Sequence, residues 1–546
     1  MRRIVASLAL SSVWGGGSEK SLVVDKRVRH LILFIFLLSN LGFAKEYLIK
    51  WKSLNTFKNI QVGDRSIRGL DILEKLSPHS RLTKVEINDS EKQLVLSKIK
   101  MNPDVEYVVP NKKFFALGMQ SSAHSPKLQQ QWALQKVNAP AAWSMAGSKG
   151  SRAIVVAVLD TGIDLEHESL KANIISGFDF KDNDSDPTDV TSILNPGHGT
   201  HCSGIAAATG LVENAVSGIS PELSIMPVRI LGKDGSGDMD DAVQGVDYAV
   251  EHGAHIISAS WSGEMFPSEA APLVEAVQRA RDAGVLFVTS SGNGDENGIS
   301  YNIDYLDIYP AGIQLSNVIT VAATDESDMP AIFSNVGMRK VHIAAPGVKI
   351  ISTLPKSRYD VLSGTSMSAP LVAGLAAYLK SLNPKLSPED LKAILLSTGT
   401  SLNIKTACNC RVDAWSATDV VLHKKPYLLP NAATLALGDT LHFELKNSNA
   451  VNFVSSDSSI AHVSASGVLE SLASGRVKVT ATDVKGNTLS SNWIRIKAPG
   501  DDEEDDDGSS SSQSSDPYAC PLETPQECED ACKEHEGLPW CEISRI

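Results

Sequence analysis

The feature that most constrains the fold is an alternation, from Trp132 to about Val420, between short apolar runs and amphipathic helical stretches. Runs such as AIVVAVLD, SIMPVRIL, HIISASWSG and VLFVTSSGN are apolar on both faces, and helical segments such as DMDDAVQGVDYAVEHG separate them. This pattern is typical of a parallel sheet that helices cover on both sides. The sequence therefore predicts a three-layer α/β domain, whose functional site lies beyond the carboxyl ends of its strands.

Three glycine-flanked segments of this region carry reactive side chains. Asp160 ends the apolar strand of VAVLDTGID, His198 lies in the first turn of a helix in GHGTHCSG, and Ser366 opens a long buried helix in SGTSMSAPLVAG. A carboxylate at the end of an apolar strand is costly unless a partner satisfies it. A serine at a helix N-terminus lies beside free backbone N–H groups that can stabilise an oxyanion. Together the three residues are the parts of an activated serine nucleophile.

The segment GHGTHC has a second interpretation, because two histidines and a cysteine could bind a metal. Such a site needs a third or fourth ligand at a suitable spacing, and the chain contains neither an HExxH nor a CxxC pattern. The sequence therefore favours His198 as a catalytic base over the metal alternative.

The three segments, in the order Asp, His, Ser, resemble those of the subtilisin-like serine proteases (subtilases) over about 290 residues. Cys202 after the second histidine resembles the thermitase-like and proteinase K-like branches. The resemblance implies a serine endopeptidase that hydrolyses peptide bonds through an acyl-enzyme, with the triad Asp160, His198 and Ser366 and no catalytic cofactor. It also implies an oxyanion hole formed by the Asn293 amide and the Ser366 N–H, with His201 in a structural role.

The same resemblance implies how a polypeptide substrate binds. The substrate lies extended between two segments, and further residues line one wall of the primary specificity pocket. The two segments are Gly235, Ser236 and Gly237, and Ser260, Trp261 and Ser262; the wall residues are Ser290, Ser291 and Gly292. No buried acid is evident in this pocket, which favours large apolar or aromatic side chains. Asp295 and Glu296 near the rim leave basic side chains as the alternative.

A structural calcium ion is a further expectation from the resemblance. The loop DFKDNDSDPTD contains Asp179, Asp184, Asp186 and Thr188, where thermitase-like enzymes hold calcium. Alternating oxygen ligands on a loop suit this hard cation. The alternative is a solvated acidic loop.

Composition and resemblance divide the rest of the chain. Basic residues precede the apolar run LILFIFLL, which indicates a secretory signal. NPDVEYVVPN resembles the subtilase inhibitory propeptide, and the period-2 strands of RVKVTATD resemble a group 2 bacterial immunoglobulin-like domain. The expected parts are a signal peptide region (1–44), an α+β inhibitory propeptide (45–119), the catalytic domain (127–422), a β-sandwich (425–498), an acidic Ser-rich linker (499–517) and a Cys-rich tail (518–546).

The cysteines of the second half of the chain give two expectations, each with an alternative. Cys520, Cys528, Cys532 and Cys541 predict two disulfides in the tail, with a zinc site as the alternative. Cys408 and Cys410 pair with each other or with neither.

We therefore expect a secreted or extracellular enzyme, made as a self-processed zymogen that its own propeptide inhibits. The C-terminal modules then bind a cell-surface or extracellular ligand. The formal net charge of -14 includes seven charges from the run DDEEDDD, and nothing indicates nucleic-acid binding. The competing function is an adhesion or binding protein built on an inactive subtilase scaffold, which a fluorophosphonate probe would distinguish.

Overall fold

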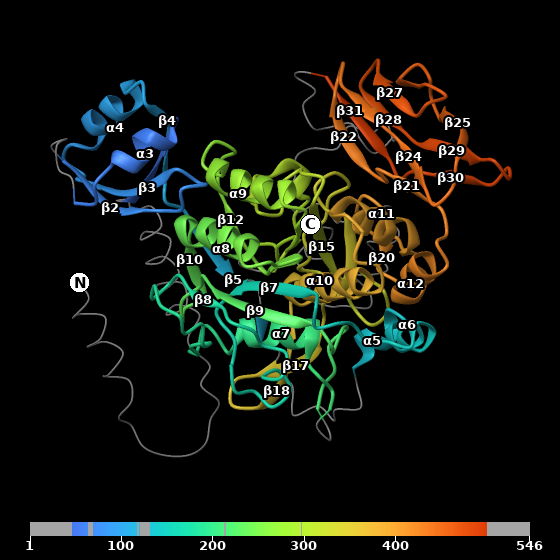
Figure 1. The fold of residues 1–546 in the computed structure, drawn as a ribbon, viewed down its shortest axis with the longest axis horizontal. Coiled ribbons are helices and arrows are strands. Elements are labelled where there is room, and N and C mark those ends of the chain that lie inside the picture. The colour runs from blue at the N-terminus through green and yellow to red at the C-terminus, as the bar shows by residue number, and fades with distance from the viewer. Residues whose placement is uncertain are drawn as a thin grey trace, which may run out of the picture. The chain divides into compact units, whose positions relative to one another are not determined.

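The computed structural model describes residues 46–63, 69–116, 119–120, 131–211, 215–295 and 298–498 (Figure 1). The expected signal region, the linker at 499–517 and the Cys-rich tail with its four cysteines lie outside these ranges. Within the described ranges, no helix combines the length and the apolar character that a bilayer crossing requires.

A nine-stranded sheet forms the centre of the catalytic part, in the order β19-β20-β16-β15-β13-β11-β7-β9-β8. Every neighbouring pair in it is parallel except β19 and β20 at one edge. The strands are β7 (Val155–Asp160), β8 (Phe178–Asp179), β9 (Ser224–Arg229), β11 (Ile256–Ala259), β13 (Leu286–Ser290), β15 (Val318–Thr324), β16 (Ile343–Pro346), β19 (Thr400–Ser401) and β20 (Cys410–Arg411).

Helices cover both faces of this sheet (Figure 1). Val156 and Val158 of β7 pack into one core with α7 (His198–Ala207), α10 (Thr365–Leu382), α11 (Pro388–Thr398) and α12 (Ala414–Leu422). Ala157 and Leu159 pack on the other face with α8 (Met239–Glu251) and α9 (Ala271–Asp282). Because successive side chains of a strand point to opposite faces, a strand between two helical layers must be apolar throughout. The predicted three-layer architecture is confirmed.

Smaller elements surround the sheet and complete the catalytic part. A four-stranded sheet has the order β10-β5-β12-β14, and a three-stranded sheet has the order β17-β18-β6. The elements are β10 (Ser236–Asp238), β12 (Trp261–Glu264), β14 (Ile308–Tyr309), β17 (Ile350–Leu354), β18 (Arg358–Ser363), α5 (Trp132–Lys136), α6 (Ala139–Ala146) and the 3₁₀ helix η1 (Ile303–Tyr305).

The N-terminal part is the expected α+β unit. Its antiparallel sheet has the order β2-β3-β1-β4, with its own apolar core around Trp51, Phe57 and Val85. Two further strands, β5 and β6, leave this sheet and join the catalytic part. The elements are β1 (Glu46–Trp51), α3 (Leu54–Asn59), β2 (Leu70–Lys75), β3 (Leu82–Ile87), α4 (Lys92–Met101), β4 (Val105–Pro110), β5 (Lys113–Ala116) and β6 (Met119–Gln120).

The C-terminal part is a β-sandwich around Phe443, Phe453 and Leu469. Most of its strand pairs are antiparallel, as the period-2 pattern predicts, but β22 and β31 pair in parallel. The strands are β21 (Tyr427–Leu429), β22 (Ala433–Ala436), β23 (Thr440–His442), β24 (Glu444–Lys446), β25 (Ala450–Ser455), β26 (Ala461–Val463), β27 (Val468–Ser471), β28 (Gly475–Val477), β29 (Val479–Asp483), β30 (Thr488–Ser490) and β31 (Ile494–Lys497).

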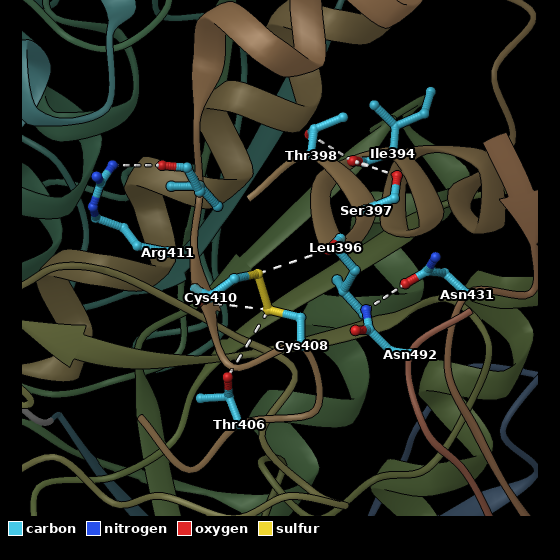
Figure 2. The surroundings of a disulfide bond; sticks show 11 residues. Ile394, Leu396, Ser397, Thr398, Thr406, Cys408, Cys410, Arg411, Asn431 and Asn492 are labelled. Carbon is cyan, nitrogen blue, oxygen red and sulfur yellow. Dashed lines mark hydrogen bonds between the residues drawn. A yellow bond between two sulfur atoms is a disulfide. The ribbon is translucent and has the colours of Figure 1, made fainter. Parts of the chain in front are cut away.

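Cys408 and Cys410 form a disulfide, which settles a pairing that the sequence left open. Figure 2 shows this bond beside the C-terminal end of α11, where Cys410 Sγ lies 3.7 Å from the carbonyl oxygen of Leu396. Cys410 belongs to β20 and is buried, whereas Cys408 is half-buried. The bond therefore ties a short loop at the edge of the central sheet.

Candidate active site

Asp160 lies at the carboxyl end of β7 and is 1% exposed. Its Oδ1 accepts a hydrogen bond from the Thr161 N–H at 2.7 Å, and it lies 2.7 Å from Nδ1 of His198. A buried carboxylate needs such partners because removal from water disfavours its charge. The partner that the sequence required for Asp160 is therefore the His198 imidazole.

His198 begins α7 and is 3% exposed. A Cβ atom on the next residue, Gly199, would lie 2.2 Å from the Gly162 carbonyl oxygen and 3.0 Å from Asp160 Cβ. Only glycine at 199 therefore lets the helix approach the end of β7 closely enough for the imidazole to meet the carboxylate. Burial is the largest single effect on the pKa of His198 and lowers it, but the opposing effects, of which the Asp160 charge is the strongest, together raise this pKa well above its usual value.

Cys202 follows His198 by one helical turn, and its Sγ lies 3.9 Å from His198 Nδ1. The thiol also donates to the Ser366 carbonyl oxygen at 3.3 Å. Burial raises the pKa of Cys202, so the group is a neutral thiol at neutral pH. Cys202 therefore packs between the imidazole and the serine segment without adding charge.

Ser366 is fully buried in the first turn of α10. A Cβ atom on Gly374 would lie 2.4 Å from Ile219 Cγ2 and 2.9 Å from the Ala206 carbonyl oxygen, so a small residue there lets α10 pack tightly on α7. The Ser366 hydroxyl donates to the Ser260 carbonyl oxygen at 3.0 Å. Among the described residues, Ser366 and His198 share no hydrogen bond, and the buried Nε2 of His198 has no hydrogen-bond partner.

Asn293 follows β13 by three residues, and its Oδ1 accepts two hydrogen bonds from Thr365. The Thr365 N–H lies at 2.9 Å and the Thr365 hydroxyl at 2.8 Å. Because both donors bind the carbonyl oxygen, the orientation of the side-chain amide is set by the residue that precedes Ser366.

The predicted substrate-binding segments lie on either side of β5. Phe115 pairs with Ser236 of β10 and with Ser262 of β12, and the Ala116 N–H donates to the Gly235 carbonyl oxygen at 2.8 Å. The Phe114 side chain is fully buried, and its ring centroid lies 4.7 Å from that of Trp261. A segment of this chain therefore forms the middle strand of the predicted substrate groove.

The predicted pocket wall is connected to the start of α10. The Gly292 N–H donates to the Thr365 hydroxyl at 3.2 Å, and the Ser291 hydroxyl donates to the Asn335 carbonyl oxygen at 2.7 Å. Ser290, the last residue of β13, is fully buried. Ser290 therefore ends the strand, and Ser291 and Gly292 lie on the loop that also carries Asn293.

The metal alternative for GHGTHC can now be judged from the positions of its residues. His201 lies away from His198, and its Nε2 is 3.2 Å from the Asp360 carbonyl oxygen. Burial lowers the pKa of His201 to about 3, so this residue is a neutral structural group. A metal site needs at least three ligating side chains close together. In the described ranges, one group of His, Cys and acidic residues has ligand atoms within 4.8 Å of one another. It consists of Asp160, His198 and Cys202, at the candidate triad.

The predicted calcium ligands do not converge in this arrangement. Asp179 on β8 is paired with Arg229, and its Oδ1 accepts the Lys181 N–H at 2.7 Å. Asp184 Oδ1 accepts the Asp186 N–H, while Asp186 Oδ1 accepts the N–H and hydroxyl of Thr188. In the described part of the chain, no three acidic groups of this loop hold oxygens within 4.8 Å of one another. The acidic side chains therefore form no cluster of three by themselves, and calcium binding by this loop stays a prediction.

Two residues that sequence reasoning missed hold these loops. Asp189 is buried and accepts hydrogen bonds from Thr161, Thr200 and Asn195, and so connects the loop after β7 to α7. Burial raises the pKa of Asp189 to about 6, although these hydrogen bonds oppose the shift. Arg229 at the end of β9 pairs with both Asp179 and Asp182. Neither role leaves a local signal in the sequence, because the partners are distant along the chain.

A parallel α/β domain with a buried Asp–His pair beside a helix-terminal serine defines a class of serine hydrolases. The Subtilase family profile matches residues 151–412, and the group 2 bacterial Ig-like domain profile matches residues 417–491. Thermitase of Thermoactinomyces vulgaris is 37% identical over 273 residues, which are 50% of this chain and 89% of thermitase. The major intracellular serine protease of Bacillus subtilis (strain 168) is 38% identical over 278 residues, 50% of this chain and 83% of that protein. Subtilisin Savinase of Lederbergia lenta is 38% identical over 273 residues, 50% of this chain and 91% of that protein.

This chain belongs to the subtilase family and is a subtilisin-like serine protease. The resemblance that the three motifs carried is therefore confirmed, as is the immunoglobulin-like module.

Proposed function

We propose that this enzyme hydrolyses peptide bonds with Ser366 as nucleophile, His198 as general base and Asp160 as the group that orients the base. Asp160 is within hydrogen-bond distance of His198 Nδ1, which leaves Nε2 of the neutral imidazole to take the serine proton. The Asn293 amide and the Ser366 N–H stabilise the oxyanion. A rotation of the serine side chain away from Ser260 O precedes the attack.

We further propose that the protein is a zymogen that cuts itself between Ala116 and Met119. The observation that carries this proposal is the strand pairing of the residues on either side of the proposed cut. Ala116 pairs with Trp261 on one side, and Met119 pairs with Ser363, three residues before the nucleophile, on the other. The connecting residues 117–118 lie outside the described ranges. The described residues on either side of the proposed cut therefore pair with β12 and with β18, the strand that leads into α10.

A substrate polypeptide is proposed to bind as β5 does. Main-chain pairing with β10 and β12 reads no particular sequence, and it suits many extended peptides. The buried contact between Phe114 and Trp261 supports a preference for a large apolar side chain at this subsite. This part of the preference belongs to the groove and is separate from the primary pocket at Ser290, Ser291 and Gly292.

Export and the role of the sandwich are also proposals. Lys26, Arg27 and Arg29 precede an apolar run that suits a secretory signal, which supports an extracellular enzyme. The immunoglobulin-like module is proposed to bind an extracellular or cell-surface ligand. A structural calcium ion rests on the family resemblance alone, since Arg229 already neutralises Asp179.

The decisive experiment is expression of the full chain with Ser366→Ala in a protease-deficient host. We expect a precursor with its N-terminal part still attached, because the nucleophile is missing. Addition of a trace of unmodified enzyme should then release a fragment whose new N-terminus, read by mass spectrometry, lies between residues 117 and 119. Maturation of Ser366→Ala on its own would disprove self-processing, and a cut elsewhere would disprove the proposed position.

A further inference from the structure

A cavity of about 250 Å³ lies between α11 and the first strands of the sandwich, formed by residues other than those of the candidate active site. Its lining includes His342 and Lys392 from the catalytic part and Trp493 and Arg495 from the sandwich. A volume of this size holds several water molecules, since each occupies about 30 Å³ in the liquid. The half-buried Lys392 side chain lies in the lining of this water-accessible volume.

Hydrogen bonds define the protonation of His342. The Thr320 N–H, which can only donate, lies 2.9 Å from His342 Nδ1, so Nδ1 carries no proton. The imidazole is 5% exposed, and burial, together with the nearby Lys392, lowers the pKa of His342 well below its usual value. His342 is therefore the neutral tautomer with its proton on Nε2.

The proton on Nε2 in turn defines the state of Lys392. Lys392 Nζ lies 2.9 Å from His342 Nε2. An ammonium group has three donors and no acceptor, so it cannot accept this N–H. The contact is a hydrogen bond only if Lys392 is a neutral amine whose lone pair accepts the His342 proton. Burial lowers the pKa of Lys392 to about 7 against the opposing charge of Glu389, which agrees with this assignment.

A neutral lysine amine is a nucleophile, and this one lies beside a cavity that can hold several water molecules. The proposed peptidase mechanism does not use it. The charged groups of the lining, besides Lys392, are Arg339, Arg495 and Glu389. Arg339 is paired with Asp304, so the guanidinium that would attract an anionic adduct in this lining is that of buried Arg495. The reagent should therefore be small, electrophilic and converted to an anion by the amine.

We propose that Lys392 is a carbamylation site for carbon dioxide. The Nζ lone pair forms a bond to the carbon of CO₂, one C=O electron pair moves onto oxygen, and one N–H proton leaves to water in the cavity. The product is a lysine carbamate with one negative charge, so atoms and charge balance without an oxidant or reductant. His342 Nε2–H, which now donates to the amine, then donates to a carbamate oxygen.

The test uses the full chain with Ser366→Ala, which prevents self-digestion, equilibrated with ¹³C-labelled bicarbonate at pH 8. Triethyloxonium ion converts carbamates to stable ethyl esters, and peptide mapping by mass spectrometry then locates them. Exposed Lys385, next to α11, is the internal comparison. We expect labelled carbamate at Lys392 in at least about tenfold excess over Lys385, because only a neutral amine reacts with CO₂ and the His342 N–H favours the neutral amine at Lys392.

Two variants complete the test. Lys392→Met should abolish the labelled peptide, and Lys385→Met should leave it unchanged. Carbamate trapped at the N-terminal α-amino group is the positive control for the chemistry. If this control is positive and Lys392 carries no carbamate, or if Lys392 and Lys385 are labelled equally, the proposal is overturned. The peptide map of the chain that retains Lys392 distinguishes these outcomes even if Lys392→Met fails to fold.

Discussion

Asp160 acts on catalysis through one hydrogen bond to His198. A substitution by asparagine removes the negative charge of this side chain and keeps its size and shape. We expect Asp160→Asn to lower kcat by about 10⁴-fold, because the amide favours the wrong imidazole tautomer and cannot stabilise the imidazolium. The rate of self-processing, followed by gel electrophoresis, is the measurement. The matched control is Asp164→Asn in the same loop, whose carboxylate accepts backbone N–H groups outside the triad. Equal effects of the two variants would refute the role of Asp160.

The pH dependence of the mature enzyme follows from His198. Only neutral imidazole can accept the serine proton, so activity is lost as the pH falls through the pKa of His198. Asp160 raises that pKa. Burial raises the pKa of the Cys202 thiol, so this group is neutral in the acid range where His198 loses its activity and should carry no charge there. We therefore expect Cys202→Ala to leave the acid limb of the kcat/KM profile at the same pH. A shift of that limb to lower pH would mean that Cys202 carries negative charge in the active enzyme.

At the scale of single residues, the sequence predicts the catalytic residues better than the buried polar residues that hold the surrounding loops in place. Asp160, His198 and Ser366 are recognisable because each must stand at the end of an element with glycine beside it. Asp189 and Arg229 are not, since their partners Thr200 and Asp179 lie 11 and 50 residues away. A carboxylate in a polar loop has the same local signature whether it is solvated or buried.

At the scale of elements, β5 offers a clean pair of neighbouring side chains. Phe114 is fully buried against Trp261, whereas Phe115 on the same strand is 41% exposed. Loss of a buried aromatic side chain removes about 1.5–3 kcal/mol of transfer free energy. We expect Phe114→Ala to slow self-processing about ten- to a hundredfold, and Phe115→Ala to change it little. Similar rates for the two variants would show that main-chain pairing alone seats the segment.

The acidic loop after β8 decides the calcium hypothesis. A ligand bound only by the native state stabilises it by about 2.7 kcal/mol at one hundred times its Kd. If the loop binds calcium, chelation lowers the melting temperature, and Asp184→Ala removes the difference between calcium and chelator. Asp457→Ala, which removes a similar turn-forming carboxylate in the sandwich, should keep the difference. If the unmodified enzyme melts at the same temperature with calcium and with chelator, the loop binds no calcium. Arg229 is then the positive group that neutralises its carboxylates.

The sequence predicts a strand well where the hydrophobic pattern of that strand alone defines it. It predicts less well which distant strands pair with each other. The apolar runs of β7, β11 and β13 specify buried parallel strands by themselves. The insertion of β5 between β10 and β12, and the parallel pairing of β22 with β31, join segments far apart in the sequence. Such pairings depend on which edges meet in the folded chain, and period-2 alternation does not encode them.

At the scale of the whole molecule, Tyr427 is one residue through which the catalytic part and the sandwich are in contact. Composition places the start of the sandwich at 425, yet Tyr427 is 5% exposed and packs in the apolar core of the catalytic part. Its hydroxyl donates to Asp390 Oδ1 at 2.9 Å, while the strand β21 that it begins pairs with β24 of the sandwich. Asp390 also closes the capping box that begins α11. A cut before Tyr427 would therefore remove part of the catalytic core.

We expect Tyr427→Phe to reduce the free energy of unfolding by about 1.5–3 kcal/mol, because it deletes a buried hydrogen bond to a carboxylate and leaves Asp390 one donor short. Urea unfolding of the Ser366→Ala chain, followed by the fluorescence of the catalytic part, measures this loss. Tyr309→Phe is the control, since Tyr309 is also buried but its hydroxyl makes no hydrogen bond to the described residues. If the two variants unfold at the same urea concentration, the Tyr427 hydroxyl does not hold the two parts together, and apolar packing of its ring alone makes the connection.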